Sequence, residues 1–106
     1  MERFFKGSPK KKDKVLEWIK ALESGNYQQI EGELYGVDSR ECCAIGLVGI
    51  LSKFKPKNPD CLAEVVDLTH YGLSTILEWN DDNGWDFPII GSKLRETYRR
   101  ETGITE

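Results

Sequence analysis

Apolar residues recur at helical spacing in two separate stretches near the ends of the chain. The first stretch begins at Ser8, a good helix N-cap, followed by Pro9, which suits the first helical position. Gly25 follows its last turn, where a left-handed C-cap favours glycine. This pattern predicts a helix that buries one face, formed by Val15, Leu16, Trp18, Ile19 and Leu22.

The second stretch has the clearest start signal in the sequence. Asp86 can cap the helix, and Trp85 before it can pack on Ile90 one turn later. Pro88 lies in the first turn, where a missing N–H is tolerated, and Gly103 ends the helix. The predicted buried face consists of Phe87, Ile90, Leu94 and Tyr98.

Polar and apolar residues alternate from Tyr27 to Tyr35, which predicts a half-buried strand. The next four residues, 36–39, are typical of a turn, and residues 40–42 can return as a short strand. Together these segments predict a small β-hairpin.

Residues 44–54 are apolar nearly all round, which predicts a buried central helix. Its predicted inner stripe includes Phe54. Gly46 and Gly49 each lower helix propensity, so we expect another backbone to approach closely there. A strand is the alternative for this segment, given Ile45, Val48 and Ile50.

The middle of the chain predicts shorter elements. After a loop at residues 53–59, Asp60 can cap a short helix, which the residues His70–Gly72 interrupt. Ser74 can cap a further turn or two, and residues 80–84 form a polar turn. The predicted fold class is therefore α+β and mainly helical, with about four short helices and one small β-hairpin around a buried central helix.

The length of 106 residues suits one domain. We expect a flexible N-terminus over residues 1–7, a single globular domain over residues 8–102 and a tail over residues 103–106. The longest apolar run is about half of a membrane span, and no signal peptide is evident, so we expect no membrane association.

Charge is distributed unevenly along the chain. Residues 1–20 hold seven basic and three acidic side chains, whereas residues 58–92 hold seven acidic side chains and no Lys or Arg. The net charge of −3 and the pI near 5.2 argue against general nucleic-acid binding. A helix-turn-helix around residues 80–84 is disfavoured, because the start of its second helix has the composition of a core.

Three cysteines without a signal peptide indicate reduced thiols. Cys42 and Cys43 adjoin an apolar segment that would raise their pKa values, so we expect buried structural thiols rather than a nucleophile. The alternative is a zinc site built from these two thiolates, Cys61 and His70. A calcium loop of the EF-hand type fails around Gly84, because the first and last positions cannot ligate. We therefore expect no catalytic residue, metal or cofactor.

Two groups of residues are candidate binding surfaces. Exposed aromatic side chains beside a charged rim are typical of protein interfaces, and this group consists of Tyr71, Glu78, Trp79, Asp81 and Asp82. The alternative is an anion site formed by basic side chains, with Trp18 or Tyr98 beside them: Lys10, Lys11, Lys12, Arg95, Arg99 and Arg100. Asp81 has no predicted helix donor, so we expect its removal to cost little stability.

Three motifs follow one another along the chain: W-x-x-A-L-x-S-G-x-Y-x-Q at residues 18–29, C-C-x-x-G at residues 42–46 and N-D-x-x-G-x-x-F at residues 80–87. In this order they resemble a family of small tailed-bacteriophage and prophage proteins. The resemblance covers roughly residues 15–94, although Ala44 replaces a leucine frequent in the family and the middle insert is shorter.

This resemblance implies a viral origin and no particular activity. Small phage accessory proteins commonly act on host factors, so we expect a non-enzymatic protein that binds a host bacterial protein, such as a defence or regulatory factor, in the host cytoplasm. One alternative is a small-ligand binder that sequesters a nucleotide signal, and another is a DNA-binding regulator. The sequence also allows the protein to form a homo-oligomer.

Overall fold

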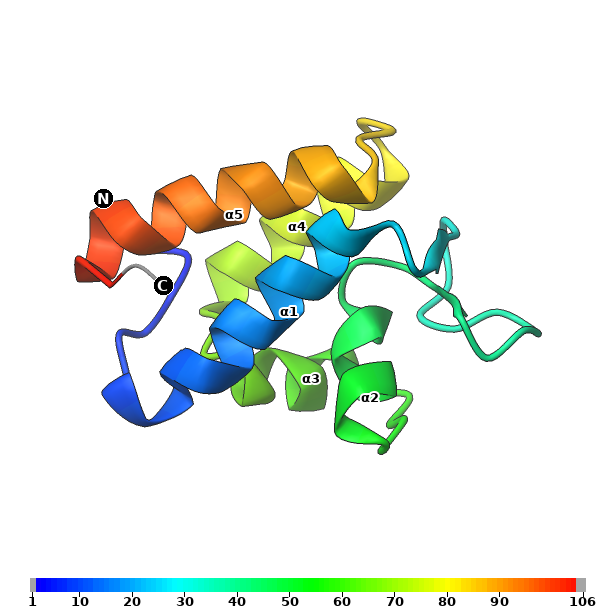
Figure 1. Ribbon diagram of the computed structural model, residues 1–106, viewed down its shortest axis with the longest axis horizontal. Coiled ribbons are helices and arrows are strands. Elements are labelled where there is room, and N and C mark those ends of the chain that lie inside the picture. Colours follow the sequence, from blue (N-terminus) through cyan, green and yellow to red (C-terminus); the bar gives the residue numbers. More distant parts are fainter. Residues whose placement is uncertain (1, 105–106) are drawn as a thin grey trace.

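A computed structural model describes residues 2–104 of the chain. Within these residues, five α-helices surround one core, and the chain has a radius of gyration of 12.4 Å (Figure 1). The helices are α1 (Lys12–Ser24), α2 (Gly46–Ser52), α3 (Pro59–Val65), α4 (His70–Asp81) and α5 (Phe87–Thr102), with a 3-10 turn, η1 (Pro9–Lys11), before α1. The mainly helical α+β class predicted from the sequence is confirmed.

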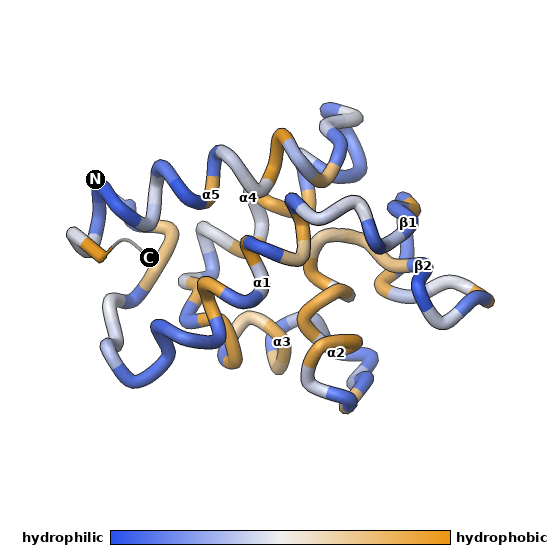
Figure 2. The backbone as a smooth tube through the Cα atoms, viewed as in Figure 1, coloured by the Kyte–Doolittle hydropathy of each residue, from blue (hydrophilic) through white to orange (hydrophobic). Residues whose placement is uncertain are grey.

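The two long helices, α1 and α5, pack against each other and bury the predicted apolar faces, except for Leu16, which is half-buried (Figure 1). Gly91 permits this contact, because a Cβ there would lie 2.8 Å from Glu23 Cγ. Gly25 and Gly103 end the helices with φ of +79° and +76°, as predicted. Along both helices, polar and apolar stretches alternate in Figure 2, as expected for helices with one buried face.

The N-terminal segment differs from the predicted flexible tail. Phe4 and Phe5 are core residues, and their N–H groups donate to the Glu101 carboxylate at 2.9 and 3.0 Å. Phe5 also forms a bridge with Leu68. Two adjacent aromatic residues bury enough apolar surface to hold this segment beside the end of α5 (Figure 1). At the other end of the chain Ile104 packs on the core, whereas residue 1 and residues 105–106 of the predicted termini lie outside the described residues.

The predicted hairpin is replaced by a different pairing. The strands β1 (Gln28–Gln29) and β2 (Glu41–Cys42) are two residues long and parallel. Only an isolated antiparallel bridge, Tyr35 to Cys42, corresponds to the predicted hairpin. Residues 31–34 bend away, with Gly32 at φ +81°, so the alternating pattern does not form one continuous strand.

Residues 46–52 form a helix rather than the alternative strand. The predicted close approach of another backbone is confirmed at Gly46, where a Cβ would overlap the Leu34 carbonyl. At Gly49 a Cβ would instead overlap a side chain, that of Tyr35. α2 is the most uniformly apolar helix in Figure 2. Phe54 does not continue its buried stripe, because the helix ends at Ser52 and the Phe54 side chain is 69% exposed.

Three helix starts differ from those predicted, and one agrees. Ser8 precedes the 3-10 turn η1 without a side-chain cap hydrogen bond, and α1 itself begins at Lys12. Asn58, rather than Asp60, caps α3 by accepting from the Asp60 N–H at 2.9 Å. Thr69, rather than Ser74, caps α4, so residues 70–72 begin a helix instead of interrupting one. Asp86 caps α5 as predicted, accepting from the Ile89 N–H at 3.3 Å.

Asn80, within the predicted polar turn, is a fully buried side chain in the last turn of α4. Its Oδ1 accepts from Gln29 Nε2 at 2.9 Å and from the Ala44 N–H at 3.1 Å. Its Nδ2 donates to the Ile30 carbonyl and to Asp81 Oδ1, both at 2.9 Å. One amide therefore joins α4 to three positions of the segment between α1 and α2.

Candidate aromatic docking surface

Four aromatic side chains form a continuous row along α4, which we call the aromatic row: Phe4, Tyr71, Trp79 and Trp85. The Phe4 ring meets the edge of Tyr71 and stacks on Trp79, with centroids 5.3 Å apart in both cases. Trp79 stacks in turn on Trp85 at 5.0 Å. Tyr71 is 42% exposed, Trp79 and Trp85 are half-buried, and Phe4 fills the space between them.

The backbone places Phe4 within this row. The Phe4 carbonyl accepts from the Thr69 N–H at 2.8 Å, at the start of α4. It also lies against Gly72, where a Cβ would collide with it. A glycine in the first turn of α4 therefore permits the N-terminal segment to lie on the helix and brings Phe4 between Tyr71 and Trp79.

The turn after α4 places the fourth ring. The Trp85 N–H donates to the Trp79 carbonyl at 3.0 Å, which folds the chain back and brings the two indoles together. Trp85 is half-buried against the core that includes Ile90, the residue on which the sequence predicted that it packs, and its ring also stacks on Trp79. The sequence signal for this pair was weak, since the two tryptophans lie six positions apart, which matches no regular helical spacing.

Acidic residues surround Trp79 in the sequence, near the C-terminal end of α4, which we call the Trp79 end of the row. Glu78 and Asp82 are exposed, as the candidate surface requires. Asp81 is half-buried, and its Oδ1 accepts from the Gly32 N–H at 3.0 Å as well as from Asn80. The expectation that Asp81 has no donor to satisfy is therefore wrong, because its donors come from a distant segment of the chain.

The candidate surface is thus partly assembled as predicted. The structure joins Tyr71 and Trp79 through Phe4, a residue that the sequence assigned to a flexible tail. The other large exposed apolar side chains, Val37, Phe54 and Ile89, lie on separate elements. The aromatic row therefore comes from three parts of the chain, and of its members only Tyr71 and Trp79 were predicted for this surface.

The six basic candidates do not form one site. Trp18 is fully buried, so it offers no ring to a ligand beside Lys10, Lys11 and Lys12. Lys11 pairs with Glu64 at 3.4 Å. Of the arginines, Arg95 and Arg99 line a pocket between α1 and α5, and none of the three lysines lines it.

The cysteine environment is apolar. Burial, and to a smaller extent the neighbouring Cys43 thiol, raises the pKa of the Cys42 thiol from 9.0 to about 12, although Lys55 lowers it. Burial also raises the pKa of Cys43. Cys42 and Cys43 are buried as expected, whereas Cys61 is exposed. Within residues 2–104, no three His, Cys, Asp or Glu side chains are grouped so that they could hold a metal ion.

No family model matches this chain, and neither a curated protein nor a solved structure is significantly similar to it. In the part of the chain that the structure describes, no helix is long and apolar enough to cross a bilayer.

Proposed function

We propose that this protein is a non-enzymatic binding protein that docks on another protein through the aromatic row. The observation that carries this proposal is that three aromatic side chains, Tyr71, Trp79 and Trp85, reach solvent in one connected row. Tyrosine and tryptophan are enriched in the centres of protein interfaces and among the residues that dominate binding energy.

The charges beside the row indicate the chemistry of the partner. Glu78 and Asp82 are exposed, and α4 contains no Lys or Arg. At the opposite end of the row, the exposed Arg3 pairs with Glu101 at 3.7 Å. We infer that the partner presents a basic patch to the Trp79 end, because complementary charge speeds association and fixes orientation.

The identity of the partner rests on the sequence resemblance. The three segments that resemble those of small bacteriophage proteins support a bacterial host protein, such as a defence or regulatory factor, in the host cytoplasm. A non-enzymatic role is supported by the cysteine environment, since raised thiol pKa values oppose nucleophilic chemistry.

Charge reversal tests the acidic end. Capture of proteins from a bacterial lysate is compared between the wild type and the double variant Glu78→Lys and Asp82→Lys. The matched control is Glu17→Lys with Glu33→Lys, which changes two exposed acids elsewhere by the same charge. We expect the first variant to lose a partner that the control retains. Equal capture by both variants contradicts the proposal.

A second pair of variants tests the aromatic component. Tyr71→Ala removes the most exposed ring of the row. Phe54→Ala removes a ring that is 69% exposed in the loop after α2. Both variants should unfold within about 0.5 kcal/mol of the wild type, the range typical of surface changes. Only Tyr71→Ala should weaken capture of the same partner. Equal weakening by Phe54→Ala would indicate a different surface.

A further inference from the structure

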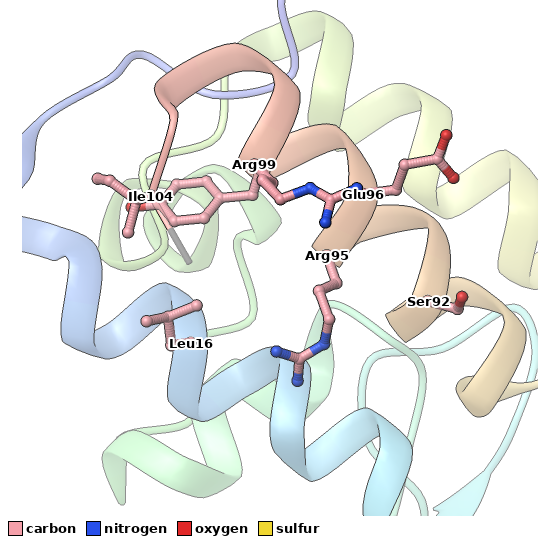
Figure 3. A pocket seen from close by; sticks show the side chains of 7 residues that line it. Leu16, Ser92, Arg95, Glu96, Arg99 and Ile104 are labelled. Atoms are coloured by element: carbon pink, nitrogen blue, oxygen red, sulfur yellow. The ribbon is translucent and has the colours of Figure 1, made fainter. Parts of the chain in front are cut away.

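A pocket of about 390 Å³ lies between α1 and the second half of α5, apart from the aromatic row. Its volume falls within the range of small-molecule sites, roughly 300–1,000 Å³. Leu16 and Ile104 lie at one end of the pocket and Ser92 and Glu96 at the other, with Arg95 and Arg99 between them (Figure 3). The pocket is therefore apolar at one end and charged along its middle.

The ion pairs around the pocket leave one cation for a ligand. Arg95 is bound to Glu23 through two contacts, at 2.6 and 3.3 Å, which hold its guanidinium in place. Glu96 lies 3.9 Å from Arg100. Among residues 2–104 no ion pair engages the exposed side chain of Arg99. An anion can therefore bind Arg99 without breaking an existing pair.

We propose that this pocket binds a small amphipathic anion, an aliphatic monocarboxylate whose head group contacts Arg99 and whose tail contacts Leu16 and Ile104. A guanidinium donates two parallel hydrogen bonds to a carboxylate, which fixes the orientation of the head group. The tail gains free energy by leaving water, since Leu16 and Ile104 supply aliphatic contacts.

The same lining argues against a nucleotide as the occupant. Tyr98 is the aromatic residue among the side chains that line the pocket, and it is only 1% exposed because it packs into the core against Phe5. A base would therefore find no ring face on which to stack, and stacking supplies much of the affinity for single bases. An aliphatic tail needs no such face.

Titration of straight-chain carboxylates, observed by NMR on the full chain, tests the proposal. We expect octanoate to shift the backbone amides of residues 16 and 92–104. Affinity should rise about fourfold for each added methylene from hexanoate to octanoate, as expected when each one is buried. Octanol, which lacks the charge, should bind at least tenfold more weakly.

Two variants of basic residues provide the matched comparison. Arg99→Gln should weaken octanoate binding at least tenfold, whereas Lys93→Gln, with the same charge change at an exposed residue of α5 outside the pocket lining, should change it less than twofold. An unchanged melting temperature in both variants shows that the fold is intact. Equal affinities of the two variants, shifts outside the pocket, or tighter binding of AMP than of octanoate would each overturn the proposal.

Discussion

In the α1–α5 pair, two regular helices bury each other's apolar faces, whereas residues 26–45 have almost no regular structure and are still held in one place. The helix pair contributes Trp18, Ile19, Leu22, Ile90 and Leu94 to the core, all of them 1% exposed or less. Residues 26–45 contribute Cys42, Cys43, Ala44 and Ile45 to it, but most of this segment lies at the surface.

The irregular segment is held by hydrogen bonds from other elements. The Asn80 amide reaches Gln29, Ile30 and Ala44, and Asp81 accepts from the Gly32 N–H. Trp18 Nε1 donates to the Ala44 carbonyl at 2.8 Å, which links this segment to α1. Where no repeating backbone pattern satisfies the polar groups, side chains from elsewhere must do so, and each becomes costly to remove.

The largest expected effect comes from Trp18, the residue that serves both regions. Trp18→Ala should lower the free energy of unfolding by about 4 kcal/mol, the size expected for deleting a buried aromatic side chain. Trp18→Phe keeps a ring but leaves the Ala44 carbonyl unpaired, so we expect a loss of about 1.5 kcal/mol. Urea denaturation of the two variants measures both values, and an equal loss would show that the hydrogen bond carries the whole effect.

Asn80→Ala should cost about 3 kcal/mol although it removes no apolar surface, because the buried Ala44 N–H loses its partner. Hydrogen exchange should localise the change, with faster exchange at Ala44 while the α1 and α5 amides keep their protection. Asn83→Ala, in the exposed turn that follows, is the control and should change stability by less than about 0.5 kcal/mol. Uniformly faster exchange would mean that the two regions unfold as one unit.

A finer comparison is between the stability contributed by two carboxylates, Asp81 at the end of α4 and Asp86 before α5. Asp86→Ala removes the cap of α5 and should cost about 1 kcal/mol. Asp81→Ala removes the acceptor for the Gly32 N–H and should also cost about 1 kcal/mol, in contrast to the small loss expected from the sequence. Thermal unfolding of both variants, with and without added calcium, measures these losses. Suppression of both losses by calcium would indicate a metal site instead.

The smallest expected effect at neutral pH concerns the thiols. The pKa of Cys42 is about 12 in the folded chain against 9.0 for an ordinary thiol, so the unfolded chain loses this proton first as pH rises. The stability contributed by this group is therefore complete below about pH 9 and is lost between about pH 9 and pH 12. The difference in unfolding free energy between the wild type and Cys42→Ala, measured by urea at several pH values, should fall over this window.

Thiol labelling under native conditions gives an independent readout at neutral pH. Cys61 is exposed and should react quickly, whereas Cys42 and Cys43 are buried and should react only after denaturation. Intact mass after timed labelling distinguishes one fast thiol from three. Three equally fast thiols would show that the cysteine segment opens easily, in contrast to the helix pair.

The sequence alone determined the two long helices, because their apolar faces, their terminal glycines and the Asp86 cap of α5 are local properties of neighbouring residues. It also determined that residues 44–49 are buried and that Gly46 and Gly49 permit a close approach, although not which groups approach them. For the candidate site, it identified Tyr71 and Trp79 as aromatic side chains that reach solvent.

Only the tertiary structure decided that Phe4 joins the aromatic row, that Asn80 lies in the core and that β1 and β2 are parallel. Each depends on partners far apart in the chain: 75 positions separate Phe4 from Trp79, and 36 separate Ala44 from Asn80. An asparagine in a polar turn has the same local pattern whether its amide faces water or four partners within the fold. The surrounding packing decides its role, because hydrogen bonds between residues far apart in the chain produce no periodic pattern in the sequence.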